Sequence, residues 1–217
     1  MNTAALSPLT PLQCDVLAKF FDVEADFFLT GGAALSGFYL HHRSTTDLVL
    51  FTTSDDALAR GRTTLPHIAA VLGCRFAWKH ESPDFRRAVL SRENEALVVD
   101  LVRDRTPQTH PKVRHGDIVV DSIEELLANK LAALVGRQEE RDLFDVYRLE
   151  QHGLRVQDAL VVAEGKDGGA TAATLAWLLK DFPLPASLVS AEERAAMAIW
   201  RDALVVRLRA GALPSGA

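Results

Sequence analysis

Apolar residues in the first part of the chain recur at spacings that predict helices and strands in alternation. Residues 27–30 and 47–52 are short apolar runs that predict strands, and the stretch between them predicts a turn followed by a helix over residues 33–40. Thr10 and Gln13 form a capping-box pattern with proline at the first helical position, so we expect a helix to begin there. Its apolar face consists of Leu12, Val16, Leu17, Phe20 and Phe21.

More strands are expected before residue 121. A helical pattern runs from Ser54 to Gly73, where the glycine favours a stop. The strands predicted after it are residues 74–79, 87–90, 96–102 and 118–120. Residues 91–95 suit a hairpin loop, and a second hairpin is expected around residues 115–117.

From Ser122 onward the pattern is helical almost to the end of the chain. Ser122 and Glu125 repeat the capping-box pattern, and Lys130 lies on the apolar stripe of the helix that they begin. The later helices are expected over residues 139–151, 156–179 and 191–210. A glycine-rich stretch at residues 165–169 predicts a weak break in the second of these.

This change of pattern predicts an α+β protein of two lobes. We expect a mixed α/β domain over residues 1–121 and a helical lobe over residues 122–217. A chain of 217 residues is long enough to bury a sizeable core, and 48% hydrophobic with 24% charged residues is ordinary for a globular protein.

Charge and cysteine content narrow the class of protein. The formal net charge of -5 argues against a general nucleic-acid coat protein, although a local basic patch could still bind an RNA end. Cys14 and Cys74 form no CxxC motif, which is typical of reduced thiols in a cytosolic protein. The first 13 residues lack a signal-peptide pattern and no apolar run has the length of a membrane span, so we expect a cytoplasmic protein with no membrane partner.

A glycine pair and two carboxylates are the candidates for chemistry. Gly31 and Gly32 would let backbone amides approach a phosphate at the start of a helix, although many such pairs only make a turn. Asp47 begins a strand and could hold a cation beside that phosphate. Asp100 interrupts an apolar strand, which is costly unless the carboxylate is paired or binds a metal. The alternative for Asp100 is a strand-end residue hydrogen-bonded to a neighbouring loop.

These residues carry a resemblance to a known family. Residues 31–51 read GGAALSGFYLHHRSTTDLVLF, which resembles the glycine-glycine plus acidic-strand signature of polymerase-beta-like nucleotidyltransferases. Residues 122–149 read SIEELLANKLAALVGRQEERDLFDVYRL. Together with Arg43-Ser44-Thr45-Thr46-Asp47, this second stretch is similar to the AbiEii/AbiGii branch, the toxins of type IV toxin–antitoxin pairs. The resemblance covers residues 28–152 and implies a mixed sheet with flanking helices.

The resemblance also implies a mechanism. Two divalent ions, Mg²⁺ or Mn²⁺, held by three carboxylates would clamp an attacking hydroxyl and a nucleoside triphosphate for in-line transfer. Asp47 would be the first metal ligand and Asp100 the third. The nucleotide's phosphates would meet Gly31, Gly32, Arg43 and Lys130, with Thr30 or Ser36 assisting.

Three residues of the second stretch have structural alternatives. Lys130 either extends to solvent or points into a cleft toward the triphosphate, and the resemblance favours the cleft. Asp142 or Asp145 would orient this lysine or the acceptor. Asp145 could instead form a helical pair with Arg141.

One position departs from the family pattern. Members read Asp-hydrophobic-Asp, whereas this chain reads Asp47-Leu48-Val49. Valine offers no lone pair to a metal, and loss of even an outer partner of a metal site typically lowers affinity or activity about 10- to 100-fold. The chain is therefore a weakened enzyme, an inactive one, or one in which another carboxylate replaces the missing ligand.

Three functions follow as hypotheses. The first is a toxin that transfers a nucleotide from a nucleoside triphosphate to an RNA, with the tRNA 3′ end as candidate acceptor and a separately encoded antitoxin as its opponent. The second is a catalytically inactive binding module with the same fold. The third is transfer to a hydroxyl of a small molecule or protein, which the same site chemistry permits.

Overall fold

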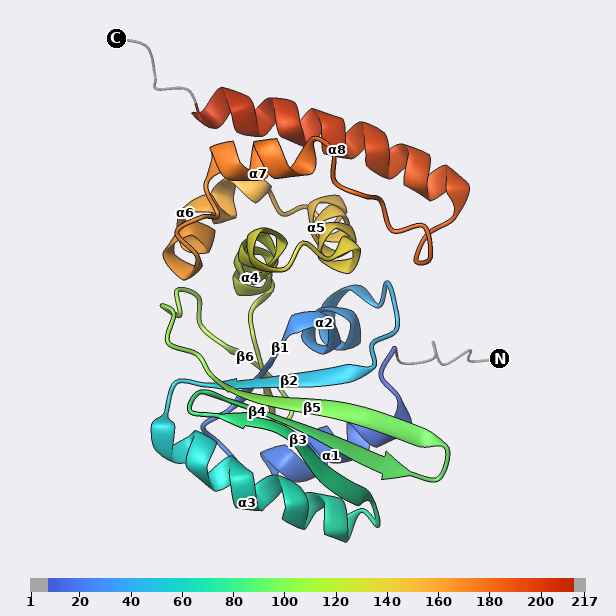
Figure 1. Cartoon of the computed structure of the whole chain (residues 1–217), viewed down its shortest axis with the longest axis vertical. Helices are drawn as coiled ribbons and strands as arrows, with labels where there is room; N and C mark the ends of the chain where they lie inside the picture. Colours follow the sequence, from blue (N-terminus) through green and yellow to red (C-terminus); the bar gives the residue numbers. More distant parts are fainter. Residues whose placement is uncertain (1–7, 213–217) are drawn as a thin grey trace. The chain divides into compact units, whose positions relative to one another are not determined.

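The computed structural model describes residues 8–212, which form two compact units. Unit 1 comprises residues 8–105 together with Pro111–Ser122, and unit 2 comprises Thr106–His110 and residues 123–212. Figure 1 shows a sheet with its helices in unit 1 and helices alone in unit 2. The α+β class expected from the sequence is confirmed.

A mixed seven-stranded sheet forms the centre of unit 1, in the order β3-β4-β5-β2-β1-β7-β6. The strands are β1 (Phe28–Thr30), β2 (Asp47–Thr52), β3 (Arg75–Ser82), β4 (Phe85–Arg92), β5 (Glu95–Arg103), β6 (Val113–His115) and β7 (Ile118–Val120). Strand β2 is parallel to β5 and antiparallel to β1, whereas β1 is parallel to β7. The central strands β2 and β5 therefore come from distant parts of the sequence.

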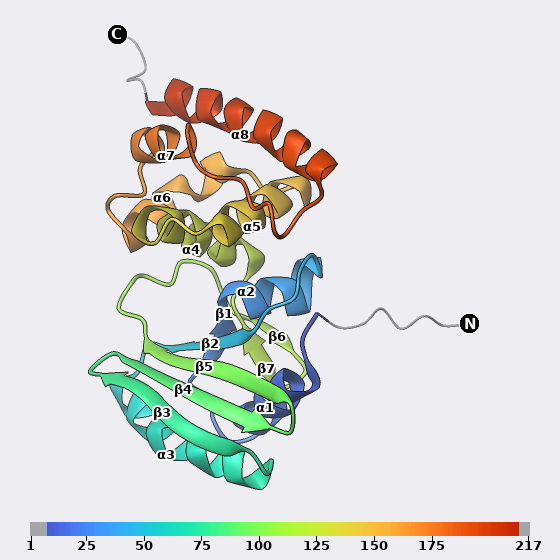
Figure 2. The same cartoon turned by 45° about the vertical axis from the view of Figure 1, so that its right-hand side comes forward.

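Helices α1 (Pro11–Phe21) and α3 (Asp55–Val71) cover one face of the sheet, and α2 (Gly31–Ala34) lies on the opposite face (Figure 2). The alternation along β2 follows from this arrangement. Leu48 and Leu50 point to the face covered by α1 and α3 and are fully buried. Asp47, Val49 and Phe51 point to the face that carries α2 and are half-buried.

The capping box at the start of α1 is confirmed by both of its hydrogen bonds. The Gln13 amide donates to the Thr10 hydroxyl, and the Thr10 amide donates to the Gln13 side chain. The buried side-chain Nε2 of Gln13 donates to Thr45 and, at 3.2 Å, to the backbone carbonyl of Asp47. One glutamine therefore ties the start of α1 to the start of β2.

The glycine pair lies inside the helix start rather than ahead of it. Gly31 has φ +69° and turns the chain directly from β1 into α2. The helix continues as the π-helical segment η1 (Leu35–Leu40) and ends at His41, which has φ 50°. The predicted helix over residues 33–40 is therefore present and begins earlier than expected.

The strands β3, β4 and β5 are longer than the sequence pattern predicts. Strands β4 and β5 pair up to Arg92 and Glu95, so the turn between them consists of Glu93 and Asn94 alone. The predicted five-residue loop is wrong because the polar residues at its ends belong to the ladder. The hairpin expected around His115 is present as β6 and β7.

Unit 2 contains five helices among the described residues. They are α4 (Ile123–Gly136), α5 (Glu140–Gln151), α6 (Val156–Lys166), α7 (Ala172–Leu179) and α8 (Ala191–Ala212). The glycine-rich stretch separates α6 from α7 completely, so the expected weak break is a full interruption. Helix α4 packs against α5, α6 and α7, and α8 packs against α7 and α5. Across residues 8–212, no helix combines the length and apolar character that a membrane crossing requires.

Candidate nucleotide site

Four side chains form a row across the sheet of unit 1. Val49 on β2 lies opposite Thr30 on β1 and opposite Asp100 on β5, and Asp100 lies opposite Arg87 on β4. Because residues that face each other across a ladder point to the same side, all four lie on the face that also carries Asp47. Asp47 and Asp100, predicted from the sequence as site residues, therefore share one face.

The glycine turn and Arg43 lie at one end of this row. A Cβ added to Gly31 would lie 3.7 Å from the Cβ of Val49, and a Cβ added to Gly32 would lie 2.7 Å from Nη2 of Arg43. The Arg43 guanidinium therefore packs directly over Gly32, where only a hydrogen leaves it room. The structure thus brings together three residues that the sequence predicts for phosphate binding.

Asp100 is buried and has a specific partner on the neighbouring strand. Its Oδ1 and Oδ2 accept hydrogen bonds from Nε and Nη2 of Arg87 at 2.8 and 2.7 Å. Such a bidentate pair satisfies both oxygens of the carboxylate. Arg87 offsets the free-energy cost of burying a carboxylate in an apolar strand. It lies on a neighbouring strand, whereas the sequence suggested a loop as the partner.

The side chains present do not fit the two-ion site that the resemblance implies. Both Asp100 oxygens are engaged by Arg87, and the position between Thr30 and Asp100 is a valine. Within residues 8–212, no three histidine, cysteine, aspartate or glutamate side chains are grouped closely enough to hold a metal ion. Asp47 and Asp100 are therefore a pair of carboxylates of which one is already neutralised.

A second buried carboxylate, Asp121, lies beside the row and was missed from the sequence. Its side chain accepts a hydrogen bond from the Thr30 hydroxyl at 2.5 Å and forms an ion pair with Lys112 at 2.5 Å. Tyr39 donates to its backbone carbonyl. The residue directly follows β7, and only the parallel pairing of β7 with β1 brings it to Thr30. Because it is already paired, Asp121 acts here as a structural partner of Thr30.

The other predicted site residues lie in unit 2, where they form a buried charge cluster. The Lys130 ammonium contacts Asp142 at 2.7 Å and Asp145 at 2.6 Å, and Arg137 forms a bidentate pair with Asp142. Burial of Asp142 opposes its ionisation, but Lys130 and Arg137 outweigh this and lower its pKa. We expected Asp142 or Asp145 to orient this lysine or the acceptor, and Lys130 contacts both aspartates.

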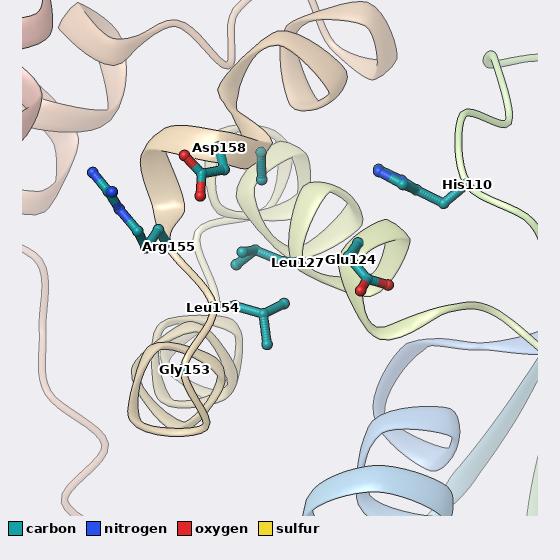
Figure 3. Close-up of a pocket in the computed structure, with 8 residues that line it drawn as sticks. His110, Glu124, Leu127, Gly153, Leu154, Arg155 and Asp158 are labelled. Atoms are coloured by element: carbon teal, nitrogen blue, oxygen red, sulfur yellow. The ribbon is translucent and has the colours of Figure 1, made fainter.

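A pocket of about 190 Å³ lies in unit 2 and contains none of the predicted site residues. Arg155 and Asp158 lie on one side of it and His110 and Glu124 on the other (Figure 3). Leu127 and Leu154 lie between them. The charged side chains around the pocket carry both signs and do not converge on one point. We therefore place the candidate site on the sheet of unit 1.

Arg87 is the site residue that the sequence reasoning missed. The predicted loop over residues 91–95, centred on Glu93, would pair Arg87 with Val99 and leave Asp100 without this partner. The observed two-residue turn shifts the ladder and places Arg87 opposite Asp100. An arginine in a β-type run beside a strand with a single carboxylate was the available signal.

Comparison with known proteins gives a family and a fold. The family described as "Nucleotidyl transferase AbiEii toxin, Type IV TA system" matches residues 15–212. No curated protein matches the chain. A solved Helicobacter pylori structure assigned as a nucleotidyltransferase is 18% identical with a TM-score of 0.59, covering 99% of this chain and 100% of that one.

A second solved structure, JHP933 from Helicobacter pylori, is 18% identical with a TM-score of 0.57. The match covers 92% of this chain and 91% of that one. At this identity, both structures support the fold alone. The family match extends over both units and includes the glycine turn, Asp47, Asp100 and the Lys130 cluster. The chain belongs to the AbiEii family of nucleotidyl transferase toxins of type IV toxin–antitoxin systems.

Proposed function

We propose that unit 1 binds a nucleoside triphosphate on the sheet face that carries Asp47, Val49 and Asp100. The phosphates would meet the backbone amides at Gly31 and Gly32 and the guanidinium of Arg43. Helix starts and arginine side chains are the usual protein partners of phosphate, and the structure places both side by side. The close approach of the Arg43 guanidinium to Gly32 at the start of α2 is the physical reason for choosing this end of the row.

The proposed reaction is slow transfer of a nucleotide from that triphosphate to an RNA end, with the tRNA 3′ end as first candidate. An RNA hydroxyl would attack the α-phosphorus, pyrophosphate would leave, and Asp47 would accept the hydroxyl proton. The observation that carries this proposal is Val49, which holds the position between Thr30 and Asp100 and offers no oxygen to the reacting groups. The acceptor and the opposing antitoxin follow from the toxin family and belong to the proposal.

A nucleotide-binding protein without transfer activity is the second candidate. The bidentate Arg87–Asp100 pair favours it because the carboxylate that the resemblance assigns to catalysis already has both oxygens engaged. The two candidates share nucleotide binding and differ only in turnover.

Transfer assays with Val49→Asp distinguish these candidates. The unmodified chain, Val49→Asp and the uncharged Val49→Asn are each incubated with labelled nucleoside triphosphates, magnesium or manganese, and total tRNA. We expect Val49→Asp to transfer at least about 10-fold faster than the unmodified chain, and Val49→Asn to show no gain. Asp47→Ala in the Val49→Asp background should abolish the gain.

Binding of the nucleotide is measured in parallel by isothermal titration. Binding without detectable transfer by the unmodified chain would establish the second candidate. Equal transfer rates for the unmodified chain and Val49→Asp would contradict the role given to Val49. Absence of nucleotide binding by the unmodified chain would contradict both candidates.

A further inference from the structure

A guanidinium lies among the carboxylates of the candidate site. Arg87 stands opposite Asp100 across the β4–β5 ladder and uses Nε and Nη2 to bind both oxygens of its carboxylate. The two N–H groups of Nη1 are not used by Asp100. Since guanidinium presents its five N–H donors in a fixed plane, the contact with Asp100 also fixes the direction of the unused donors.

The exposure of the two partners differs sharply. The Arg87 side chain is 49% exposed, whereas the Asp100 side chain is 6% exposed. The carboxylate is therefore the buried anchor, and the guanidinium is the group that a ligand on this face can reach. Phe85 packs beside the guanidinium, with its ring centroid 5.5 Å from Cζ of Arg87, and so supports it on a second side.

The charge of Arg87 also involves the second candidate carboxylate. The hydrogen bond to Asp100 raises the pKa of Arg87 against the effect of burial, and the negative charges of Asp100 and Asp47 raise it further. Asp47 is thus close enough for its charge to act on the guanidinium. A permanent cation lies near both carboxylates that the resemblance assigns to divalent ions.

We propose that Arg87, anchored by Asp100, supplies the fixed positive charge that binds the nucleotide's phosphates at this site, so that nucleotide binding does not require a divalent cation. The inference rests on the proposed nucleotide binding by unit 1 and adds a second cation to Arg43, at the end of the row opposite the glycine turn. Arginine suits this role because its planar donors match two phosphate oxygens at once, and a charge-assisted hydrogen bond of this kind is stronger than a neutral one.

The test compares nucleotide affinity with and without divalent ions. The full chain is titrated with inorganic triphosphate and with each of ATP, CTP, GTP and UTP, once in EDTA and once in magnesium. We expect the unmodified chain to bind in EDTA with an affinity within about threefold of that in magnesium. Arg87→Gln should weaken binding in EDTA about 10- to 100-fold, the effect of losing one hydrogen-bonded charge.

Arg105→Gln is the matched control in the same unit. Arg105 forms the same bidentate pair with Asp84 through Nε at 2.9 Å and Nη2 at 2.7 Å, but it is not part of the row. We expect this variant to bind nucleotide like the unmodified chain. The double variant Arg87→Gln with Asp100→Asn removes both partners, so it keeps the buried position neutral and should fold even if Arg87→Gln alone is unstable. It should show the same loss of affinity.

Asp100→Asn alone separates our proposal from a metal-ligand role of Asp100. The asparagine oxygen still accepts one hydrogen bond from Arg87, and the change removes a negative charge near the phosphates, so we expect equal or tighter binding in both buffers. A loss of about tenfold or more that appears only in magnesium would overturn the proposal, because it would place the cation on Asp100.

The remaining outcomes distinguish this inference from the proposed function. If the unmodified chain binds only in magnesium, or if Arg87→Gln binds normally in EDTA, the role of Arg87 is refuted while nucleotide binding by unit 1 stands. If the unmodified chain binds no triphosphate in either buffer, the proposed function fails and this inference fails with it.

Discussion

Val49 stands directly opposite Asp100 in the parallel β2–β5 ladder, on the face that also holds Asp47. An aspartate at position 49 would therefore meet a carboxylate on the next strand and another two residues before it on its own strand. Valine avoids this repulsion, and Arg87 neutralises the carboxylate that remains. The absence of the second acidic residue and the presence of the arginine are consequently two parts of one charge balance.

The charge balance around Asp100 predicts how Val49→Asp changes stability. Val49→Asp places like charges opposite each other, so we expect a loss of about 1 kcal/mol of stability in EDTA. Manganese should raise the melting temperature of this variant by several degrees, because three neighbouring carboxylates can share a cation. The measurement is thermal unfolding with and without manganese. Val49→Asn and the unmodified chain should show no such rise, and an equal rise in all three would refute the explanation.

Gly31 is predicted to be required for its backbone conformation. Gly31→Ala should cost about 1–2 kcal/mol, since the residue has φ +69° and the added Cβ meets Val49 only at an ordinary 3.7 Å. Urea unfolding measures this cost. Gly116→Ala is the matched control, because Gly116 has φ +63° and open space around it. Both variants should lose similar stability, and only Gly31→Ala should weaken triphosphate binding; a loss of binding in both would indicate a general effect on the fold.

Gln13 is predicted to position the start of β2. Gln13→Ala removes the bond from the Thr10 backbone N–H to the Gln13 side chain and the bonds to Thr45 and the Asp47 carbonyl, whereas Thr10→Ala removes only the bond from the Gln13 backbone N–H to the Thr10 hydroxyl. Each variant loses one of the two capping-box bonds, at a cost of about 1 kcal/mol, and the loss of the buried bonds should add about 1–3 kcal/mol in Gln13→Ala. Urea unfolding compares the two. Equal stability of these variants would show that the contact with β2 contributes nothing.

The stability of unit 2 is predicted to depend on pH through Glu125. This buried carboxylate accepts hydrogen bonds from the amides of Thr109 and His110, and it pairs with Lys166 at 2.5 Å. Burial opposes its ionisation, but the bonds from Lys166 and His110 outweigh this and lower its pKa from 4.5 to about 2. The ionised form therefore stabilises the fold above about pH 4.5, and this contribution disappears as the pH falls toward 2.

We expect Glu125→Gln to lose about 3 kcal/mol at pH 7, the free-energy equivalent of this pKa shift. The difference from the unmodified chain should shrink as the pH approaches 2. Urea unfolding at several pH values checks both points. The exposed neighbour Glu124 provides the control Glu124→Gln, which should change little. A difference between Glu125→Gln and the unmodified chain that is constant with pH would contradict the assignment to ionisation.

Lys130 is predicted to be essential for the fold of unit 2, whatever its role in chemistry. Lys130→Met leaves Asp142 and Asp145 buried without the ammonium that contacts both, which should cost about 3–5 kcal/mol. Adding Asp145→Asn removes one of these charges and should restore part of the stability. Thermal unfolding of the two variants is the measurement. If Lys130→Met melts like the unmodified chain, the ion pairs are not stabilising the unit.

Much of the fold could be predicted because it depends on local periodicity. The capping box of α1, the alternation along β2 and the helices after Ser122 all follow from residues close together in the sequence. Strand ends were less predictable: Ser91 and Arg92 are polar and read as loop, yet they pair with Ala96 and Glu95. Polar residues fit a strand whose outer face is not fully buried, so polarity alone does not mark its end.

The sequence by itself determined which residue types are available: a glycine pair, Asp47, a valine where a second acid is expected, and one carboxylate in an apolar strand. Only the tertiary structure decided which of them are already neutralised. The β4–β5 register placed Arg87 on Asp100, the β1–β7 pairing placed Thr30 on Asp121, and the α4–α5 packing placed Lys130 on Asp142 and Asp145. The physical reason is that a single-residue shift in register moves a side chain to the opposite face of a sheet, so charge partners depend on long-range pairing that local periodicity does not contain.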